Sequence, residues 1–258
     1  MHTNDDVTII RCRADNYAYL MHDADSGETV LVDAPEAGPI LEVLARRNWT
    51  LTHLLLTHHH DDHIEGTNAL RDANPGLQVI GAAADAHRLP PLDRQVAPGD
   101  VIETAVGDFA VFDAPGHTVG HIAFHLPARA ALFSGDSLMV HGCGRLFEGT
   151  AQQMFDTIAR FMRLPGDTRI CSGHDYAAAN LAFAATCAPD AAALDARRAE
   201  LPLLADKGHP TVGVTLAEDI RLNPYMRAHL PEVKAAVDMD GAPDLAVFAE
   251  IRRRKDAF

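Results

Sequence analysis

The chain has 258 residues, enough for one large domain or for one domain with an extension. Its net charge of −14 disfavours a nucleic-acid partner, and its hydrophobic content of 47% is ample for a core. No apolar run approaches the ~20 residues of a membrane span, so we expect no membrane association. The four cysteines are widely spaced and the N-terminus shows no basic-then-apolar signal segment, so we expect a cytoplasmic protein.

From residue 7 to about residue 172 the sequence predicts strands mixed with helices. Strands are predicted at 7–11, 17–22, 29–33, 54–56, 77–81, 101–104, 109–112, 122–126, 131–133 and 169–171. Helices are predicted at 40–47, 64–73 and 151–163, and then, in alanine-rich runs broken by prolines, at 177–188, 191–205, 231–237 and 245–255. We therefore predict a mixed α/β domain at 1–172 and a helical domain at 173–258.

The most informative stretch is residues 57–63, Thr-His-His-His-Asp-Asp-His. It lies between the apolar strand predicted at 54–56 and the start of a predicted helix. Ligands bind at such strand-to-helix connections in α/β proteins. The alternative is a solvated, histidine-rich loop, but this density of imidazoles and carboxylates is typical of a metal site.

Backbone geometry assigns roles within this stretch. Residues two apart in an extended segment point the same way, so His58 and His60 can converge on one cation while His59 points elsewhere. Asp62 and His63 enter the helical turn and can serve a second cation nearby.

Three short motifs can supply the remaining ligands, and each follows a predicted strand. They are Gly116-His117-Thr118, Gly135-Asp136 and Gly173-His174-Asp175. In each, a glycine lets the backbone pass close to a site. Each motif alone is weak, but together with the histidine stretch they predict a metal centre.

The combined pattern resembles the metallo-β-lactamase superfamily, and within it glyoxalase II, the hydroxyacylglutathione hydrolases. Residues 30–33, a predicted strand that ends in Asp33, are similar to the superfamily's first motif. Further stretches are similar to glyoxalase II in particular, namely 143–150 (Cys-Gly-Arg-Leu-Phe-Glu-Gly-Thr), 173–176 (Gly-His-Asp-Tyr), 223–227 (Asn-Pro-Tyr-Met-Arg) and the basic end 252–256.

The resemblance implies a four-layer αβ/βα sandwich, of the α/β (α+β) class, with a helical C-terminal domain that binds substrate. It also implies two divalent metal ions, for which we expect zinc, with iron or manganese as alternatives. Seven side chains are the implied ligands. The first ion would be held by His58, His60 and His117, the second by Asp62, His63 and His174, with Asp136 bridging the two.

Two of these ligands, Asp62 and Asp136, are also the implied catalytic residues. Asp33 is expected to orient a ligand, since metal-binding imidazoles usually have a partner on their other ring nitrogen. The implied reaction is hydrolysis of acyl-glutathione thioesters, above all S-D-lactoylglutathione to D-lactate and glutathione in methylglyoxal detoxification. Two cations lower the pKa of a shared water from about 15.7 to near neutrality, and the hydroxide between them attacks the carbonyl.

The resemblance also implies which side chains contact glutathione. They are Arg145, Phe147, Tyr176, Arg252 and Lys255. Arg145 stands where the family has Lys, which keeps the charge, and Phe147 stands where it has Tyr, which removes one hydrogen bond. A solvated helix face is the alternative for the basic C-terminal end.

Other functions are weighed against this one. One is a different thioesterase or hydrolase of the same fold, and another is a mononuclear-iron persulfide dioxygenase, which the helical extension argues against. A non-enzymatic metal module would favour a closed tetrahedral shell over seven ligands with a bridging carboxylate. We expect the partner to be a small-molecule thioester, and the protein to be a monomer or a weak homo-oligomer.

Overall fold

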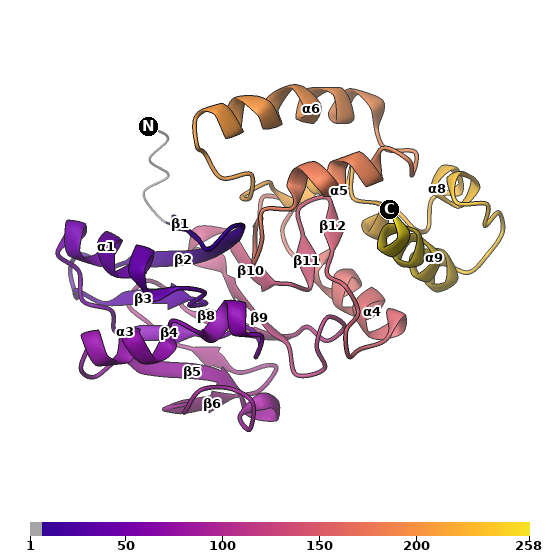
Figure 1. The fold of residues 1–258 in the computed structure, drawn as a ribbon. Helices are drawn as coiled ribbons and strands as arrows, with labels where there is room; N and C mark the ends of the chain where they lie inside the picture. The colour runs from indigo at the N-terminus through magenta and orange to yellow at the C-terminus, as the bar shows by residue number, and fades with distance from the viewer. Residues whose placement is uncertain (1–6) are drawn as a thin grey trace. The chain divides into compact units, whose positions relative to one another are not determined.

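The computed structural model describes residues 7–258 and forms two compact units. The first unit extends to Asp113 and includes Gly120–Gly135, and the second comprises Ala114–Val119 and Asp136–Phe258. Figure 1 follows the chain by colour. Residues 1–6 lie outside the described part. They belong to the predicted N-terminal domain and to the segment that we expect to lack a signal. The predicted domain boundary at 172/173 stays a prediction.

The first unit contains a six-stranded sheet whose strands follow chain order. They are β1 (Thr8–Cys12), β2 (Asn16–His22), β3 (Thr29–Val32), β4 (His53–Leu55), β5 (Gln78–Ala82) and β6 (Arg94–Val96). The pairs β1–β2 and β2–β3 are antiparallel, and β3 to β6 pair in parallel. Parallel neighbours need crossover connections. Helices supply two of these connections, α1 (Ala37–Arg47) after β3, and α2 (Asp61–Ile64) with α3 (Thr67–Ala73) after β4.

A second, antiparallel sheet completes the first unit. Its strands there lie in the order β10 (Ala131–Gly135), β9 (Ile122–Leu126), β8 (Phe109–Asp113) and β7 (Val101–Ile102). Short 3-10 turns follow β5 and β9, at η1 (Ala83–Asp85) and η2 (Pro127–Arg129).

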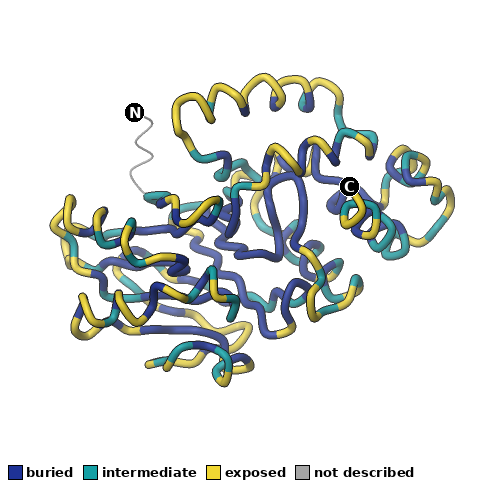
Figure 2. The backbone as a smooth tube through the Cα atoms, in the orientation of Figure 1, coloured by how far each residue is buried: buried dark blue, intermediate teal, exposed yellow. Residues whose placement is uncertain are grey.

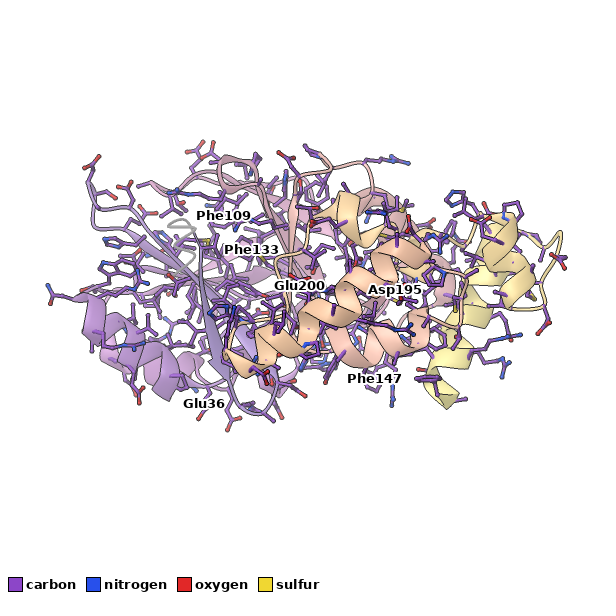
Figure 3. All side chains as sticks on the ribbon, turned by 90° about the horizontal axis from the view of Figure 1, so that it is seen from above. Glu36, Phe109, Phe133, Phe147, Asp195 and Glu200 are labelled. Carbon is purple, nitrogen blue, oxygen red and sulfur yellow. The ribbon has the colours of Figure 1, made fainter. Side chains whose placement is uncertain are left out.

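The two sheets of the first unit pack face to face through aromatic side chains. Tyr19 on β2 meets the edge of Phe133 on β10, with ring centroids 5.4 Å apart, and Phe109 lies 6.1 Å from the same ring. Figure 3 shows Phe109 and Phe133 close together. In Figure 2 the strands β3, β4 and β5 are largely buried, whereas α1 and α3 expose their outer faces. The core of the first unit therefore lies between its two sheets and beneath its helices. The parallel strands β3 and β4 end at the same edge of their sheet.

The second unit begins with short strands and continues as helices. The strands are β11 (Leu138–Met139) and β12 (Gly142–Cys143), which pair as a hairpin, and β13 (Arg169–Ser172). The helices are α4 (Ala151–Phe161), α5 (Ala177–Ala184), α6 (Ala191–Asp206), α7 (Leu216–Asp219), the 3-10 turn η3 (Pro224–Met226), α8 (Pro231–Ala236) and α9 (Asp244–Ala257).

Phe248 on α9 organises the packing of this helical region. Its ring lies 5.5 Å from Phe155 on α4 and 5.2 Å from Tyr225 in η3. Residues 173–258, all of which the structure describes, contain helices and no strand, as predicted.

The sequence predicted the longer elements within a few residues of their observed ends. It did not predict β6, β11, β12 and α7, which have two to four residues each and are too short to show a periodicity. The helix predicted at 64–73 is two helices, α2 and α3, interrupted at Gly66. None of the helices within residues 7–258 combines the length and the apolar character that a bilayer crossing requires.

Candidate metal centre

The histidine stretch leaves the end of β4 in the first unit and gathers three imidazoles. The ring of His58 lies 4.7 Å from that of His60 and 4.2 Å from that of His63, measured between centroids. His59 is directed to another partner, with its Nδ1 atom 3.3 Å from Oδ2 of Asp85. His58 and His60 are therefore close together while His59 has another partner, and their convergence on one cation stays a prediction.

Asp33, at the end of β3, fixes the orientation of this stretch. Its Oδ1 atom accepts a hydrogen bond from the Thr57 amide, and its Oδ2 atom accepts one from the Thr57 hydroxyl, both at 2.9 Å. Oδ2 also lies 2.8 Å from Nδ1 of His63. An ionised carboxylate only accepts hydrogen bonds, so Nδ1 of His63 carries the proton and Nε2 keeps its lone pair.

The same reasoning applies to His58. Its Nδ1 atom lies 3.1 Å from the Thr57 hydroxyl oxygen. Because that hydroxyl already donates its proton to Asp33, it accepts from Nδ1 of His58. In both predicted ligands the Nδ1 atom therefore has a protein partner, which leaves Nε2 as the atom that would bind a metal.

Asp62 is positioned by a residue far away in the sequence. The buried side-chain amide of Asn16, the first residue of β2, donates to the Asp62 carbonyl oxygen at 2.9 Å and to its Oδ2 atom at 3.1 Å. Oδ2 of Asp62 lies 3.9 Å from Nε2 of His63, so the two predicted ligands are neighbours. Sequence reasoning missed Asn16, because no local pattern connects it with the histidine stretch.

Glu65 and Gly66, shortly after the histidine stretch, differ in the side chain that each position can accept. A Cβ atom on Gly66 would lie 2.9 Å from the Ala37 nitrogen, so this position needs a glycine. Glu65 adopts ordinary helical angles and forms an ion pair with Arg13. Its position therefore accepts a side chain without distortion.

The second unit places two further predicted ligands, both histidines, around the carboxylate of a third. Oδ2 of Asp136 lies 3.4 Å from Nε2 of His117 and 3.2 Å from Nε2 of His174. All three side chains are buried. Two imidazole nitrogens that face the same carboxylate oxygen are the arrangement expected around a bridging ligand.

The orientation of His117 depends on a backbone carbonyl. Its Nδ1 atom lies 2.8 Å from the carbonyl oxygen of Arg145, a group that only accepts, so Nδ1 donates and Nε2 keeps its lone pair. Gly144, the residue before Arg145, permits this approach, because a Cβ atom there would lie 1.9 Å from the Asp136 carbonyl oxygen.

Three of the predicted substrate contacts lie around these ligands and are accessible. The Phe147 ring packs at 5.3 Å on the His117 ring and is 62% exposed. Tyr176 stacks on His174 with ring centroids 4.8 Å apart. Arg145 is exposed, and its Nε atom lies 3.6 Å from Asp256. Substrate contact by these residues stays a prediction.

The two basic residues of α9 have different surroundings. Arg252 is only 6% exposed, and it donates to the Cys143 carbonyl and to Asp256, both at 2.8 Å. Lys255 is half-buried and donates to the Ala179 carbonyl at 3.0 Å. Burial, and then the charge of Arg252, lowers the pKa of Lys255. Contact of both with glutathione stays a prediction, but the Arg252 guanidinium already holds the protein's own backbone.

Comparison with protein families divides the chain into two matched regions. The description "Metallo-beta-lactamase superfamily" matches residues 14–174, and "Hydroxyacylglutathione hydrolase C-terminus" matches residues 175–258. The helical region and the strand-rich region are thus both similar to known families.

Individual relatives agree with this division. A hydroxyacylglutathione hydrolase from Cereibacter sphaeroides is 53% identical over 98% of this chain and 99% of its own length. One from Ruegeria pomeroyi is 51% identical with the same coverage. Among solved structures, ETHE1 from Myxococcus xanthus is 26% identical, with a TM-score of 0.65 over 97% of this chain and 98% of its own. The BLEG-1 B3 metallo-beta-lactamase, also 26% identical, has a TM-score of 0.61 over 65% of this chain and 91% of its own.

Proposed function

Because the chain belongs to the hydroxyacylglutathione hydrolase family of the metallo-β-lactamase superfamily, we propose that it hydrolyses S-D-lactoylglutathione to D-lactate and glutathione. Membership confirms the family and the fold predicted from the motifs, a metallo-β-lactamase fold with a helical C-terminal region. It also makes the chain a metal-dependent hydrolase. The observation that carries the proposal is that Asp136 faces the imidazoles of both His117 and His174.

The metal part of the proposal is a dinuclear site. Its ligands would be the seven side chains that the sequence motifs predict, namely His58, His60, Asp62, His63, His117, Asp136 and His174. The donor set fits divalent ions such as zinc, iron or manganese, of which we favour zinc. The fit is supported by His58, His63 and His117, because each ring has its Nδ1 atom beside an oxygen of the protein, which makes Nε2 the proposed ligand atom.

When bound, divalent ions lower the pKa of a water molecule and polarise the thioester carbonyl. The protein's part is to hold the ligands and to exclude alternative orientations. Asn16 keeps one oxygen of Asp62 engaged, and Asp33 keeps the His63 ring in one tautomer. The leaving thiolate has a conjugate acid with a pKa of ~8.5, so no general acid is required from the protein.

Recognition of the glutathione carrier would fall to the second unit. Arg145 and Lys255 carry positive charges that can meet the two carboxylates of glutathione. Tyr176 offers a hydroxyl, and Phe147 offers a ring where the family has Tyr. The monomeric or weakly oligomeric state and the cytoplasmic location predicted from the sequence belong to this proposal as well.

No observation favours the alternatives. A persulfide dioxygenase was weighed because it shares the metal motifs, but the C-terminal description that matches residues 175–258 is that of a hydroxyacylglutathione hydrolase. The relatives from Cereibacter sphaeroides and Ruegeria pomeroyi, each covering 98% of the chain, carry the same name.

The test supplies purified protein with S-D-lactoylglutathione and measures D-lactate and free thiol together. We expect equal amounts of the two products. The same acyl group on a small neutral thiol should be hydrolysed with a lower kcat/KM, and the matched amide far more slowly. No turnover of any thioester would overturn the proposal. Oxygen uptake with glutathione persulfide, without thioester hydrolysis, would replace it with the dioxygenase.

A further inference from the structure

The β11–β12 hairpin is held at four successive residues by side chains from the helical region. Each residue from Val140 to Cys143 offers one backbone group to a different side chain. The contacts are Asn180 Nδ2 to the Val140 carbonyl (3.1 Å), the His141 amide to Asp219 Oδ1 (2.7 Å), Asn223 Nδ2 to the Gly142 carbonyl (3.0 Å) and Arg252 Nη1 to the Cys143 carbonyl (2.8 Å). We call Asn180, Asp219, Asn223 and Arg252 the hairpin anchors.

The anchors are all buried and come from four separate parts of the helical region, α5, α7, the residue before η3, and α9. Two of them also hold each other, because Asn223 Nδ2 donates to Asp219 Oδ2 at 2.8 Å. Buried polar groups of this kind are costly to leave without a partner, so their geometry is strongly specified.

The hairpin turn is strained, which indicates that its surroundings determine it. His141 has a φ of +61°, a left-handed conformation that residues other than glycine rarely adopt. Its Nδ1 atom lies 2.7 Å from Asp219, and its Nε2 atom accepts a hydrogen bond from Arg197 on α6. Such conformations persist where neighbouring contacts over-determine them.

This hairpin lies between two parts of the proposed metal centre. It begins two residues after Asp136 and ends two residues before Arg145, whose carbonyl orients His117. Across its base the Gly144 amide donates to the Ser137 carbonyl at 3.3 Å. A shift of the hairpin would therefore move the Asp136 carboxylate and the partner of His117 together.

We propose that the hairpin anchors are positioning residues for His117 and Asp136, so that the helical region sets the geometry of metal ligands in addition to any contact with substrate. The inference rests on the proposed function, because it needs a metal at these ligands. It also gives a role to Asn223, which begins the Asn-Pro-Tyr-Met-Arg motif and contacts no predicted ligand.

The motif contains its own matched control. Asn223 donates to the hairpin, whereas the Arg227 guanidinium donates to the Ala188 carbonyl, outside the hairpin, at 2.6 Å. Asn223→Ser removes the reach to Gly142 but keeps an oxygen that can accept from the Tyr225 amide. Arg227→Met removes the part-buried bond to Ala188 and the ion pair with Glu232, both outside the hairpin. Both variants should lose stability, and only the first should disturb the metal ligands.

The main readout is the affinity for Zn²⁺, measured by competition with a chromogenic chelator. Changes to residues that orient metal ligands typically weaken affinity by about 10–100-fold. We expect a loss of this size in Asn223→Ser and a change of less than about twofold in Arg227→Met. Each affinity is measured at the same number of degrees below the melting temperature of that metal-free protein. Equal affinities in Asn223→Ser and the parent, or equal losses in both variants, would overturn the inference.

Hydrogen exchange of the metal-free proteins separates this inference from the proposed function. Amides at 140–144 should exchange faster in Asn223→Ser than in the parent or in Arg227→Met. If the parent binds no Zn²⁺ and hydrolyses no thioester, the proposed function fails and the positioning role fails with it. If the parent binds and hydrolyses while Asn223→Ser retains its affinity, only the positioning role fails.

Discussion

The Nδ1 atom of His63 lies 2.8 Å from Oδ2 of Asp33, and both side chains are buried. This contact joins the end of β3 to the first turn of α2 and decides which nitrogen of His63 carries the proton. Asp33 itself has a φ of +59°, a conformation that Asp and Asn tolerate better than most other residues. Asn therefore replaces Asp33 without new strain in the backbone.

Asp33→Asn should weaken metal binding by about 10–100-fold while the fold is retained. An amide can donate to His63 Nδ1, which favours the tautomer whose Nε2 carries a proton and cannot bind a metal. Competition with a chelator measures the change. Asp61→Asn, an exposed neighbour at the start of α2, is the control and should behave like the parent. Equal affinities in the two variants would show that Asp33 does not set the tautomer.

Asp136→Ala should abolish the retention of both metal ions, because Asp136 is proposed to ligate each of them. Its Oδ2 atom already lies within 3.4 Å of the ring nitrogens of His117 and His174. Elemental analysis after purification without chelator should give close to two ions per parent chain and close to none for the variant. A reproducible value near one in a fully active parent would contradict the dinuclear site.

Features of the site that depend on local geometry were predictable from the sequence. The opposite directions of His58 and His59 follow from the alternation of side chains in an extended segment. The role of Asp33 follows from its place at the end of a strand. The contact of Asn16 with Asp62 spans 46 residues and has no periodic signature, so only the fold reveals it.

The environment of α9 shows a second limit of sequence reasoning. The spacing of Arg252 and Lys255 predicts that they share one helix face. What covers that face depends on packing from elsewhere in the chain. Tyr225 lies beneath the Arg252 guanidinium, with the ring centroid at 5.6 Å, and the Cys143 carbonyl accepts from it. Arg252 is therefore buried. The sequence does not predict this burial, because a charged residue near the end of a chain is usually exposed.

Alkaline pH should destabilise the protein through its buried thiols. Burial raises the pKa of Cys12 and of Cys171 from 9.0 to about 12, and that of Cys143 to about 11. A folded-state pKa above the unfolded value gives stability that is complete below about pH 9 and is lost as the pH rises towards 11–12. Urea unfolding between pH 8 and 11 should show this loss, and Cys171→Ala should reduce its slope. A midpoint that is constant across this range would contradict the prediction.

Lys255 and Arg252 should give different signatures when each is replaced by Ala. Lys255→Ala should raise KM for S-D-lactoylglutathione by about tenfold, with kcat and metal content unchanged. A hydrogen bond to a charged group contributes about 1.5–3 kcal/mol, and each ~1.4 kcal/mol is a factor of ten, so the lower end suits a half-exposed lysine. The effect should fall on KM because the residue would contact the carrier and not the reacting carbonyl.

Arg252→Ala should instead act mainly on stability and on the hairpin. The variant leaves the buried Cys143 carbonyl without its donor, which costs about 1–3 kcal/mol and lowers the melting temperature by about 2–10 °C. Lys207→Ala, an exposed lysine after α6, is the control for the loss of a positive charge.

A small neutral thioester should be hydrolysed equally by the parent and by Lys255→Ala, because it has no carboxylate for the lysine to bind. If Lys255→Ala also leaves KM for lactoylglutathione unchanged, the lysine only packs at the helix surface, and carrier recognition must depend on Arg145 and Tyr176.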